Sequence, residues 1–156
     1  MVTEAKKSGI RHIVKQSIIG ADLRADVEAM RLHRQEEKVI EISGIPYTFL
    51  RSNAFMQNLV NFYGHIIKAQ NVFYLPTGNG KVSFVDVRDI AAVAVQALTK
   101  NGSRHVNNVY EITGQEALSY YQAAEILSNA TGKKIDYVNI SDEAARGTMK
   151  EVGLRD

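Results

Sequence analysis

Apolar residues along this chain fall into short β-branched runs separated by longer stretches with helical spacing. The run at 11–17 has a β-branched centre and predicts a strand that opens onto a loop, and 22–43 predicts a helix that ends at Gly44. A second strand is expected at 46–51, where Pro46 is tolerated because it stands at the start. The first third of the chain therefore predicts a strand, a helix and a strand.

The later residues continue this alternation, and residues 3–8 predict a short helix before it. The remaining elements are expected in this order: helix 54–70, strands 72–75 and 82–85 around a turn or hairpin at 76–80, a helix from Asp86 or Asp89 to about Lys100, strand 108–113, a helix from the capping-box pair Ser119 and Gln122 to Gly132, strand 135–140, and a last helix capped by Ser141. Residues 90–98 are apolar on most faces, which predicts burial between layers. Crossovers of about 15–20 residues between strands favour parallel βαβ units covered by helices, so the fold class is α/β.

Composition narrows the function classes without selecting one. The 156 residues suit a single domain, and 19 Lys and Arg against 17 Asp and Glu give a charge of +2, too balanced to predict nucleic-acid binding. The chain has no Cys, which excludes a disulfide scaffold, thiolate metal sites and cysteine catalysis, and no metal is expected. No apolar run is long enough for a membrane span. We expect a cytoplasmic protein.

Several segments in order along the chain resemble the NmrA-like family of atypical short-chain dehydrogenases/reductases. The phrase Gly44-Ile-Pro-Tyr-Thr-Phe-Leu-Arg-Ser-Asn-Ala-Phe-Met-Gln-Asn58 resembles a strand and loop of that family, and 8–17 with Gly20-Ala-Asp22 resembles its fifth strand and the loop that follows. The segments 82–91 and 109–114 are similar as well. The resemblance implies a Rossmann-like parallel sheet with helices on both faces, plus a small substrate lobe from about 54–85 and 115–156.

One part of the family pattern is missing from this sequence. No Gly-x-Gly-x-x-Gly or Gly-x-x-Gly-x-x-Gly occurs, although the resemblance places such a phosphate-binding turn about a hundred residues before Met1. The chain is therefore expected to be a single incomplete NAD(P)-binding domain, 1–156, whose N-terminal phosphate-binding half is absent. Strand 11–17 would then keep an exposed edge, which favours a homo-oligomer, and binding of NADP or NAD by this chain alone is not expected.

Two ionisable residues interrupt an otherwise apolar helix stripe. At 100° per residue, Met30, His33, Glu37 and Ile40 fall within one arc of helix 22–43. A solvated His–Glu pair is one interpretation. By resemblance, His33 stands where the plant isoflavone-reductase group has a Lys implicated in proton transfer, so the other is that His33 is a general acid–base and Glu37 orients it or raises its pKa.

Strand ends provide the other candidate site residues, because ligands of open parallel sheets gather beyond the carboxyl ends of strands. Ser17 suits a ligand contact there, or is a loop hydroxyl bonded to backbone, and Ser52 and Asn53 are expected to cap the next helix. By resemblance, the cofactor-binding residues are Ser17, Ile18, Arg51, Asn53 and Phe55, and Met56 and Asn58 border the substrate.

Two functions remain open at this stage. The first is an NAD(P)H-dependent oxidoreductase that reduces a small quinone or carbonyl compound. The alternative is a regulatory protein that senses NAD(P) without reaction, which the absence of a Tyr-x-x-x-Lys pair from 22–43 favours.

Overall fold

The computed structural model describes residues 1–99 and 104–151, which fall into two compact units. Unit 1 comprises Met1–Met56 and Phe84–Gly114, and unit 2 comprises Gln57–Ser83 and Gln115–Asp156. The ranges of unit 2 lie close to those expected for a substrate lobe, and that role stays a prediction. Among the described residues, no helix has both the length and the apolar character required to cross a membrane.

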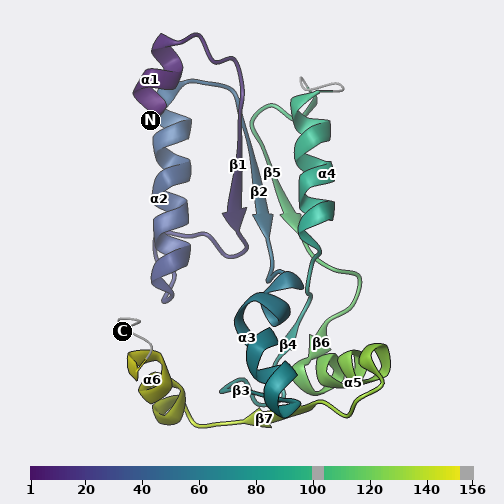
Figure 1. Ribbon diagram of the computed structural model, residues 1–156. Coiled ribbons are helices and arrows are strands. Elements are labelled where there is room, and N and C mark those ends of the chain that lie inside the picture. The colour runs from purple at the N-terminus through teal and green to yellow at the C-terminus, as the bar shows by residue number, and fades with distance from the viewer. Residues whose placement is uncertain (100–103, 152–156) are drawn as a thin grey trace. The chain divides into compact units, whose positions relative to one another are not determined.

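Unit 1 is a three-stranded parallel sheet between helices. Its elements are α1 (Val2–Lys7), β1 (Ile13–Ile18), α2 (Glu28–Ser43), β2 (Tyr47–Ser52), α4 (Val87–Leu98) and β5 (Asn108–Ile112). The strand order is β1-β2-β5, with parallel pairing throughout. Helices α2 and α4 cover opposite faces of this sheet (Figure 1). The predicted α/β class, with a parallel sheet and helices on both faces, is confirmed.

Alternation along β1 and β2 sorts their side chains between the two helices. Ser17 and Arg51 face α2, whereas Val14, Gln16 and Leu50 face α4. On the α4 face, the core consists of Leu50, Val85 and Ile90, with partly buried apolar neighbours. The sheet therefore separates a polar cluster on one face from an apolar core on the other.

Helix α2 begins later than its apolar pattern predicts. The expected start was residue 22, but the first helical residue is Glu28. Asp22 explains the delay, because its side chain accepts from the Arg24 amide and its carbonyl accepts from the Ala25 amide, which closes a turn instead of a helix. The end is as predicted, with Gly44 in the left-handed conformation at φ 74°.

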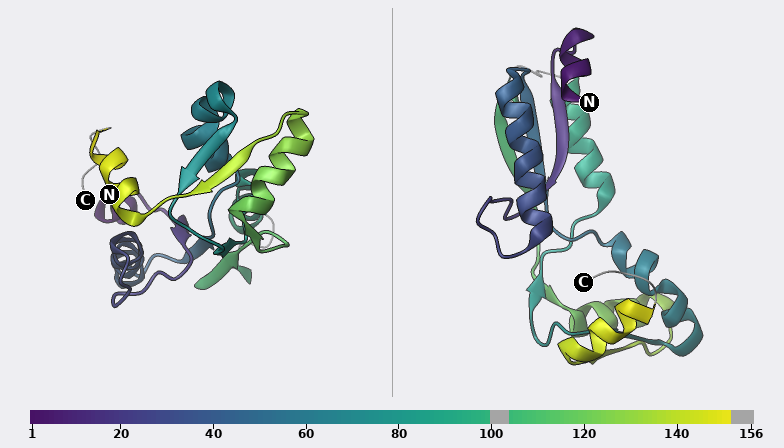
Figure 2. Two further views of the ribbon diagram at one scale, coloured as in Figure 1. Left: turned by 90° about the horizontal axis from the view of Figure 1, so that it is seen from below. Right: turned by 90° about the vertical axis from the view of Figure 1, so that its left-hand side faces the viewer.

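Unit 2 has two small sheets and three helices. Its elements are α3 (Gln57–Gln70), β3 (Val72–Leu75), β4 (Lys81–Val82), β6 (Leu118–Ser119), α5 (Tyr120–Thr131), β7 (Asp136–Asn139) and α6 (Asp142–Glu151). Phe73 and Tyr137 centre its core, together with Ala124 and Ile135. The pair β3 and β7 lies side by side within this unit (Figure 2).

The hairpin interpretation of 72–85 is wrong. Strand β3 pairs in parallel with β7, and β4 pairs antiparallel with β6. The intervening turn is bonded to β7, because Gly78 N donates to Asn139 Oδ1 at 2.7 Å and Thr77 Oγ1 lies 2.9 Å from the Tyr137 hydroxyl. These contacts hold the turn against a distant strand instead of folding β3 back onto β4.

Helix termini follow the predicted signals, but the burial of α4 does not. Asp86 caps α4, and Ser119 and Gln122 form the predicted capping box of α5. Helix α4 ends at Leu98, and the expected end at Lys100 lies outside the described residues. Burial on most faces is wrong, since Val95 is 55% and Leu98 57% exposed.

Strand β1 is at an edge of the sheet, because within the described residues it pairs with β2 alone. A hollow of about 650 Å³ flanks it on the α2 side and includes Val39. Another of about 350 Å³ flanks it on the α4 side and includes Leu98. Both hollows are lined by Val14 and Gln16, so they meet around the free edge that the sequence predicted.

Candidate functional site

The carboxyl ends of β1 and β2 bring three predicted site residues into one buried cluster. Ser17 Oγ donates to Glu37 Oε1 over 2.7 Å. Arg51 donates from Nε to Oε1 at 3.0 Å and from Nη2 to Oε2 at 2.6 Å. The parallel register makes this meeting possible, since Ser17 and Arg51 are direct partners across the strands. Ser17 and Glu37 are both 0% exposed, so the cluster lies under α2.

A second guanidinium completes the surroundings of Glu37. Arg34, one turn earlier on α2, donates to Glu37 Oε2 at 3.1 Å and also forms two hydrogen bonds to Glu41. The buried carboxylate thus accepts from a hydroxyl and from two guanidinium groups. This arrangement anchors α2 to the ends of both strands.

The hydrogen bonds also decide the ionisation of Glu37. Burial acts to raise the pKa of Glu37, but the hydrogen bonds from Arg51 and Ser17 and the charge of Arg51 outweigh it, so this pKa lies below its ordinary value. Glu37 is therefore a carboxylate at neutral pH. It can hold Ser17 and Arg51 in place, but it carries no proton to give.

The His33 ring lies outside the cluster around Glu37, beside the Lys15 side chain of β1. Helix α2 runs antiparallel to β1 (Figure 1), and Glu37 is level with Ser17. His33 is one helical turn, about 5 Å, closer to the start of α2. Its Nδ1 is 3.1 Å from Lys15 Nζ and 4.0 Å from Glu36 Oε2.

The expected pairing of His33 with Glu37 is wrong. Among the described residues, no hydrogen bond joins them, because Glu37 turns toward Arg51 and His33 toward Lys15. The helical-wheel argument correctly placed both on the face that meets the sheet. It missed that the two side chains diverge to different strands, and Lys15 was not identified as a site residue.

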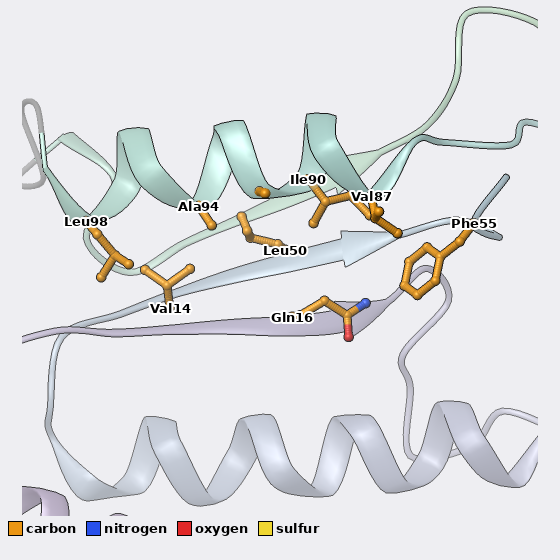
Figure 3. Close-up of a pocket in the computed structure, with 9 residues that line it drawn as sticks. Val14, Gln16, Leu50, Phe55, Val87, Ile90, Ala94 and Leu98 are labelled. Carbon is orange, nitrogen blue, oxygen red and sulfur yellow. The ribbon is translucent and has the colours of Figure 1, made fainter. Parts of the chain in front are cut away.

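On the other face of the sheet, Gln16 and Phe55 line one end of the 350 Å³ hollow. Figure 3 shows the Gln16 carboxamide and the Phe55 ring near the end at which the strands terminate, with Leu98 at the far end. Gln16 Nε2 donates to Ser52 Oγ at 2.8 Å and to the Ser17 carbonyl at 2.6 Å. Alternation along β1 was the signal that could have identified Gln16.

The remaining predicted site residues lie after the strand ends. Ile18 is the last residue of β1, and Met56 is 45% exposed. Asn53 does not serve as a helix cap, because α3 begins four residues later and the Asn53 side chain accepts from the Ala54 amide at 2.8 Å. Asn58 belongs to α3, in unit 2.

Two groups of the Glu37 cluster keep hydrogen-bonding capacity that the described residues do not use. The Ser17 hydroxyl donates its hydrogen bond to Glu37 and keeps lone pairs that can accept, and Arg51 keeps Nη1 beyond its two bonds to that carboxylate. Ser17 is 0% exposed, whereas the Arg51 side chain keeps 20% exposure. The chain has no Gly-rich turn to hold a pyrophosphate. No group of three His, Asp or Glu in the described part of the chain is placed to share a metal ion.

Comparisons with known proteins find similar chains. A family model described as the NmrA-like family matches residues 1–152. The chain is 42% identical over 154 residues to an NAD(P)H azoreductase of Xenophilus azovorans. This match covers 99% of this chain and 53% of that protein. The NADPH-dependent quinone oxidoreductase of Escherichia coli, solved with NADPH, is 30% identical with a TM-score of 0.84 and coverage of 99% and 53%.

A third similar structure is the triphenylmethane reductase of Citrobacter sp., solved with NADP(H). It is 26% identical with a TM-score of 0.82, and the match covers 99% of this chain and 53% of that one. The chain therefore spans about half the length of the relatives that it matches.

Proposed function

Because the chain belongs to the NmrA-like family, we propose that it serves an NAD(P)H-dependent oxidoreductase that reduces a small quinone or carbonyl compound. The observation that carries this proposal is the 42% identity to an NAD(P)H azoreductase across nearly the whole chain. The quinone class is favoured by the 30% identity to quinone oxidoreductase 2 of Escherichia coli. The cofactor would be NADP or NAD.

The proposal assigns roles to residues at the carboxyl edge of the sheet and after it. Glu37 holds Ser17 and Arg51 toward the nicotinamide end of the cofactor, and His33 acts as the general acid–base for the substrate. The full set of proposed contacts is Ser17, Ile18, Arg51, Asn53 and Phe55 for the cofactor, Met56 and Asn58 for the substrate, and His33 and Glu37 for catalysis. Glu37 acts in this scheme as a fixed carboxylate that positions its neighbours.

Turnover with a complete phosphate-binding site tests the proposal. A chimera would be made by joining to Met1 the part of the Xenophilus azovorans azoreductase that precedes its matched region. Its oxidation of NADPH and of NADH would be followed by absorbance with a panel of quinones. We expect quinone-dependent oxidation by the chimera and little by the 156-residue chain alone, which lacks the Gly-rich turn. A folded chimera that binds NADPH yet turns over no acceptor would contradict the proposal.

A second candidate is a sensor that binds NAD(P) without reaction. The observation in its favour is that helix α2 contains no Tyr, so the Tyr-x-x-x-Lys pair of ordinary short-chain dehydrogenases is missing. Replacing His33 by Ala separates the two. A sensor keeps its cofactor affinity and shows no rate to lose, whereas the reductase keeps its affinity and loses rate.

We propose further that the free edge of β1 pairs with a second copy of the chain. Support comes from the unpaired edge and from the apolar hollows on both sides of it. Action in the cytoplasm, with no nucleic-acid partner, stays a prediction from the balanced charge and the absence of Cys.

A further inference from the structure

Lys15 uses all three of its ammonium protons within the described residues. Its Nζ lies 2.9 Å from Glu36 Oε2, 3.1 Å from the Gln16 carbonyl oxygen and 3.1 Å from His33 Nδ1. The side chain is only 13% exposed. An ammonium has three donors and no acceptor, so these three contacts account for every proton that it carries.

This count determines which nitrogen of His33 carries the proton. Because Lys15 can only donate, Nδ1 must present its lone pair, and a neutral imidazole then carries its hydrogen on Nε2. A proton on Nδ1 would point at an ammonium 3.1 Å away. The Glu36 carboxylate is 4.0 Å from Nδ1, too far to accept a hydrogen bond in its place.

We propose that Lys15 is a positioning residue that holds His33 in the neutral Nε2–H form, which makes His33 a hydrogen-bond donor to a ligand oxygen. Nε2 forms no hydrogen bond within residues 1–99 and 104–151, and the His33 side chain is 31% exposed. A ligand oxygen that reaches this nitrogen would therefore meet a donor. The residue expected to be a general acid–base becomes specifically an acid.

The chemical consequence rests on the proposed reductase function. When the reduced nicotinamide of the proposed NADPH or NADH cofactor gives hydride to a carbonyl or quinone carbon, the oxygen of that group becomes basic and takes the Nε2 proton. The Nδ1 lone pair then takes a proton from the Lys15 ammonium, so the ring changes tautomer but stays neutral. After the product leaves, Nε2 takes a proton from water and Nδ1 returns its proton to the Lys15 amine, which restores the Nε2–H tautomer and the Lys15 ammonium. Each N–H bond that breaks is matched by one that forms, and no charge is left on the imidazole.

Nitrogen NMR of the histidine rings tests the assignment without any turnover. The chain would be labelled with ¹⁵N-histidine, and His33 identified among the four histidines by the signal lost in His33→Gln. We expect a protonated Nε2 and an unprotonated Nδ1 in the wild type at neutral pH. Lys15→Met should lose this preference and show a tautomer mixture, whereas Lys15→Arg, which also only donates, should keep it.

Lys38 provides the matched control, since it lies on α2 and is exposed. Lys38→Met should leave the His33 signals unchanged. A wild-type His33 with its proton on Nδ1, or identical ring signals in Lys15→Met and the wild type, would overturn the inference. Circular dichroism confirms that each variant is folded.

Kinetics of the chimera separate this inference from the proposed function. Lys15→Met should lower kcat by roughly 10- to 100-fold with KM nearly unchanged, and Lys15→Arg should restore most of the rate. If His33 shows the expected tautomer in a chimera without turnover, the reductase proposal fails and the assignment stands. If an active chimera carries the proton on Nδ1, the assignment fails and the reductase stands.

Discussion

Glu37 shows how one buried carboxylate can organise the ends of two strands. It is completely buried, and its oxygens accept from Ser17, Arg34 and Arg51. A buried charge with these partners is satisfied, but removing the charge leaves guanidinium groups that have lost their counter-ion. The stability of unit 1 should therefore be sensitive to this position.

Glu37→Gln should lower the free energy of unfolding by about 2–4 kcal/mol. This loss is at the low end for a buried ion pair because the Arg51 side chain retains 20% exposure to solvent. Urea unfolding followed by circular dichroism measures it. Glu36→Gln is the control, since that side chain is 64% exposed, and it should cost less than about 1 kcal/mol. Equal losses in the two variants would contradict the buried-anchor role.

Acid should weaken the fold through the same carboxyl group. The pKa of Glu37 in the folded protein lies below its ordinary value of 4.5, so its contribution to stability is complete above that value and is lost as the pH falls through the lower folded pKa. The difference in free energy of unfolding between the wild type and Glu37→Gln should therefore be smaller at about pH 3 than at about pH 7. A gap that widens in acid would show that the sign is wrong.

The helical pattern alone could predict that His33 and Glu37 face the sheet, and it did so correctly. Their partners could not be predicted, because Lys15 and Arg51 come from strands whose register is set by pairing between distant segments. The strand-end position of Ser17 was visible in the sequence, but its complete burial against Glu37 depends on how α2 packs.

At the scale of elements, the helix ends follow local chemistry. Gly44 and Gly132 both take the left-handed conformation after α2 and α5, as their positions predicted. The strand partners of unit 2 were missed because β3 and β7 are separated by sixty residues and their pairing is held by Tyr137 and Asn139. Local signals specify where elements stop, whereas side-chain contacts decide which strands meet.

Gly132→Ala should destabilise the protein by about 1 kcal/mol, because a Cβ is strained at φ 69° although nothing lies within 4 Å of it. Gly64→Ala is the matched control in the same unit. Gly64 lies inside α3, where a Cβ would meet Val60 at an ordinary 3.6 Å, so Ala should stabilise by about 0.5–1 kcal/mol. Thermal unfolding should give opposite shifts, and shifts of the same sign would refute the conformational argument.

For the molecule as a whole, the order of strands and helices was enough to predict a parallel sheet covered on both faces. The resemblance to the NmrA-like family predicted that β1 would have an unpaired edge, and within the described residues it pairs with β2 alone. What could not be predicted was the depth of the two hollows beside it. That depth depends on how α2 and α4 are spaced from β1.

Self-association through β1 should depend on the concentration of the chain and on Val39. Val39 lines the 650 Å³ hollow and is 53% exposed, so Val39→Lys should weaken association without unfolding the monomer. Ile42→Lys is the control, because Ile42 is 84% exposed and does not line that hollow. Sedimentation velocity measures both. Association that survives Val39→Lys, or is lost equally in Ile42→Lys, would argue against this edge.

The Lys15 ammonium donates to the Gln16 carbonyl and so protects the edge of β1 against pairing with another strand. An incoming strand must displace this ammonium before it can form hydrogen bonds to the backbone there. An isolated peptide strand would then leave both flanking hollows exposed to water. A partner with apolar side chains on both faces of its edge strand would bury both hollows and so offset the free energy lost when Lys15 is displaced. We therefore expect β1 to pair with the edge of a folded, layered partner in preference to an isolated extended peptide.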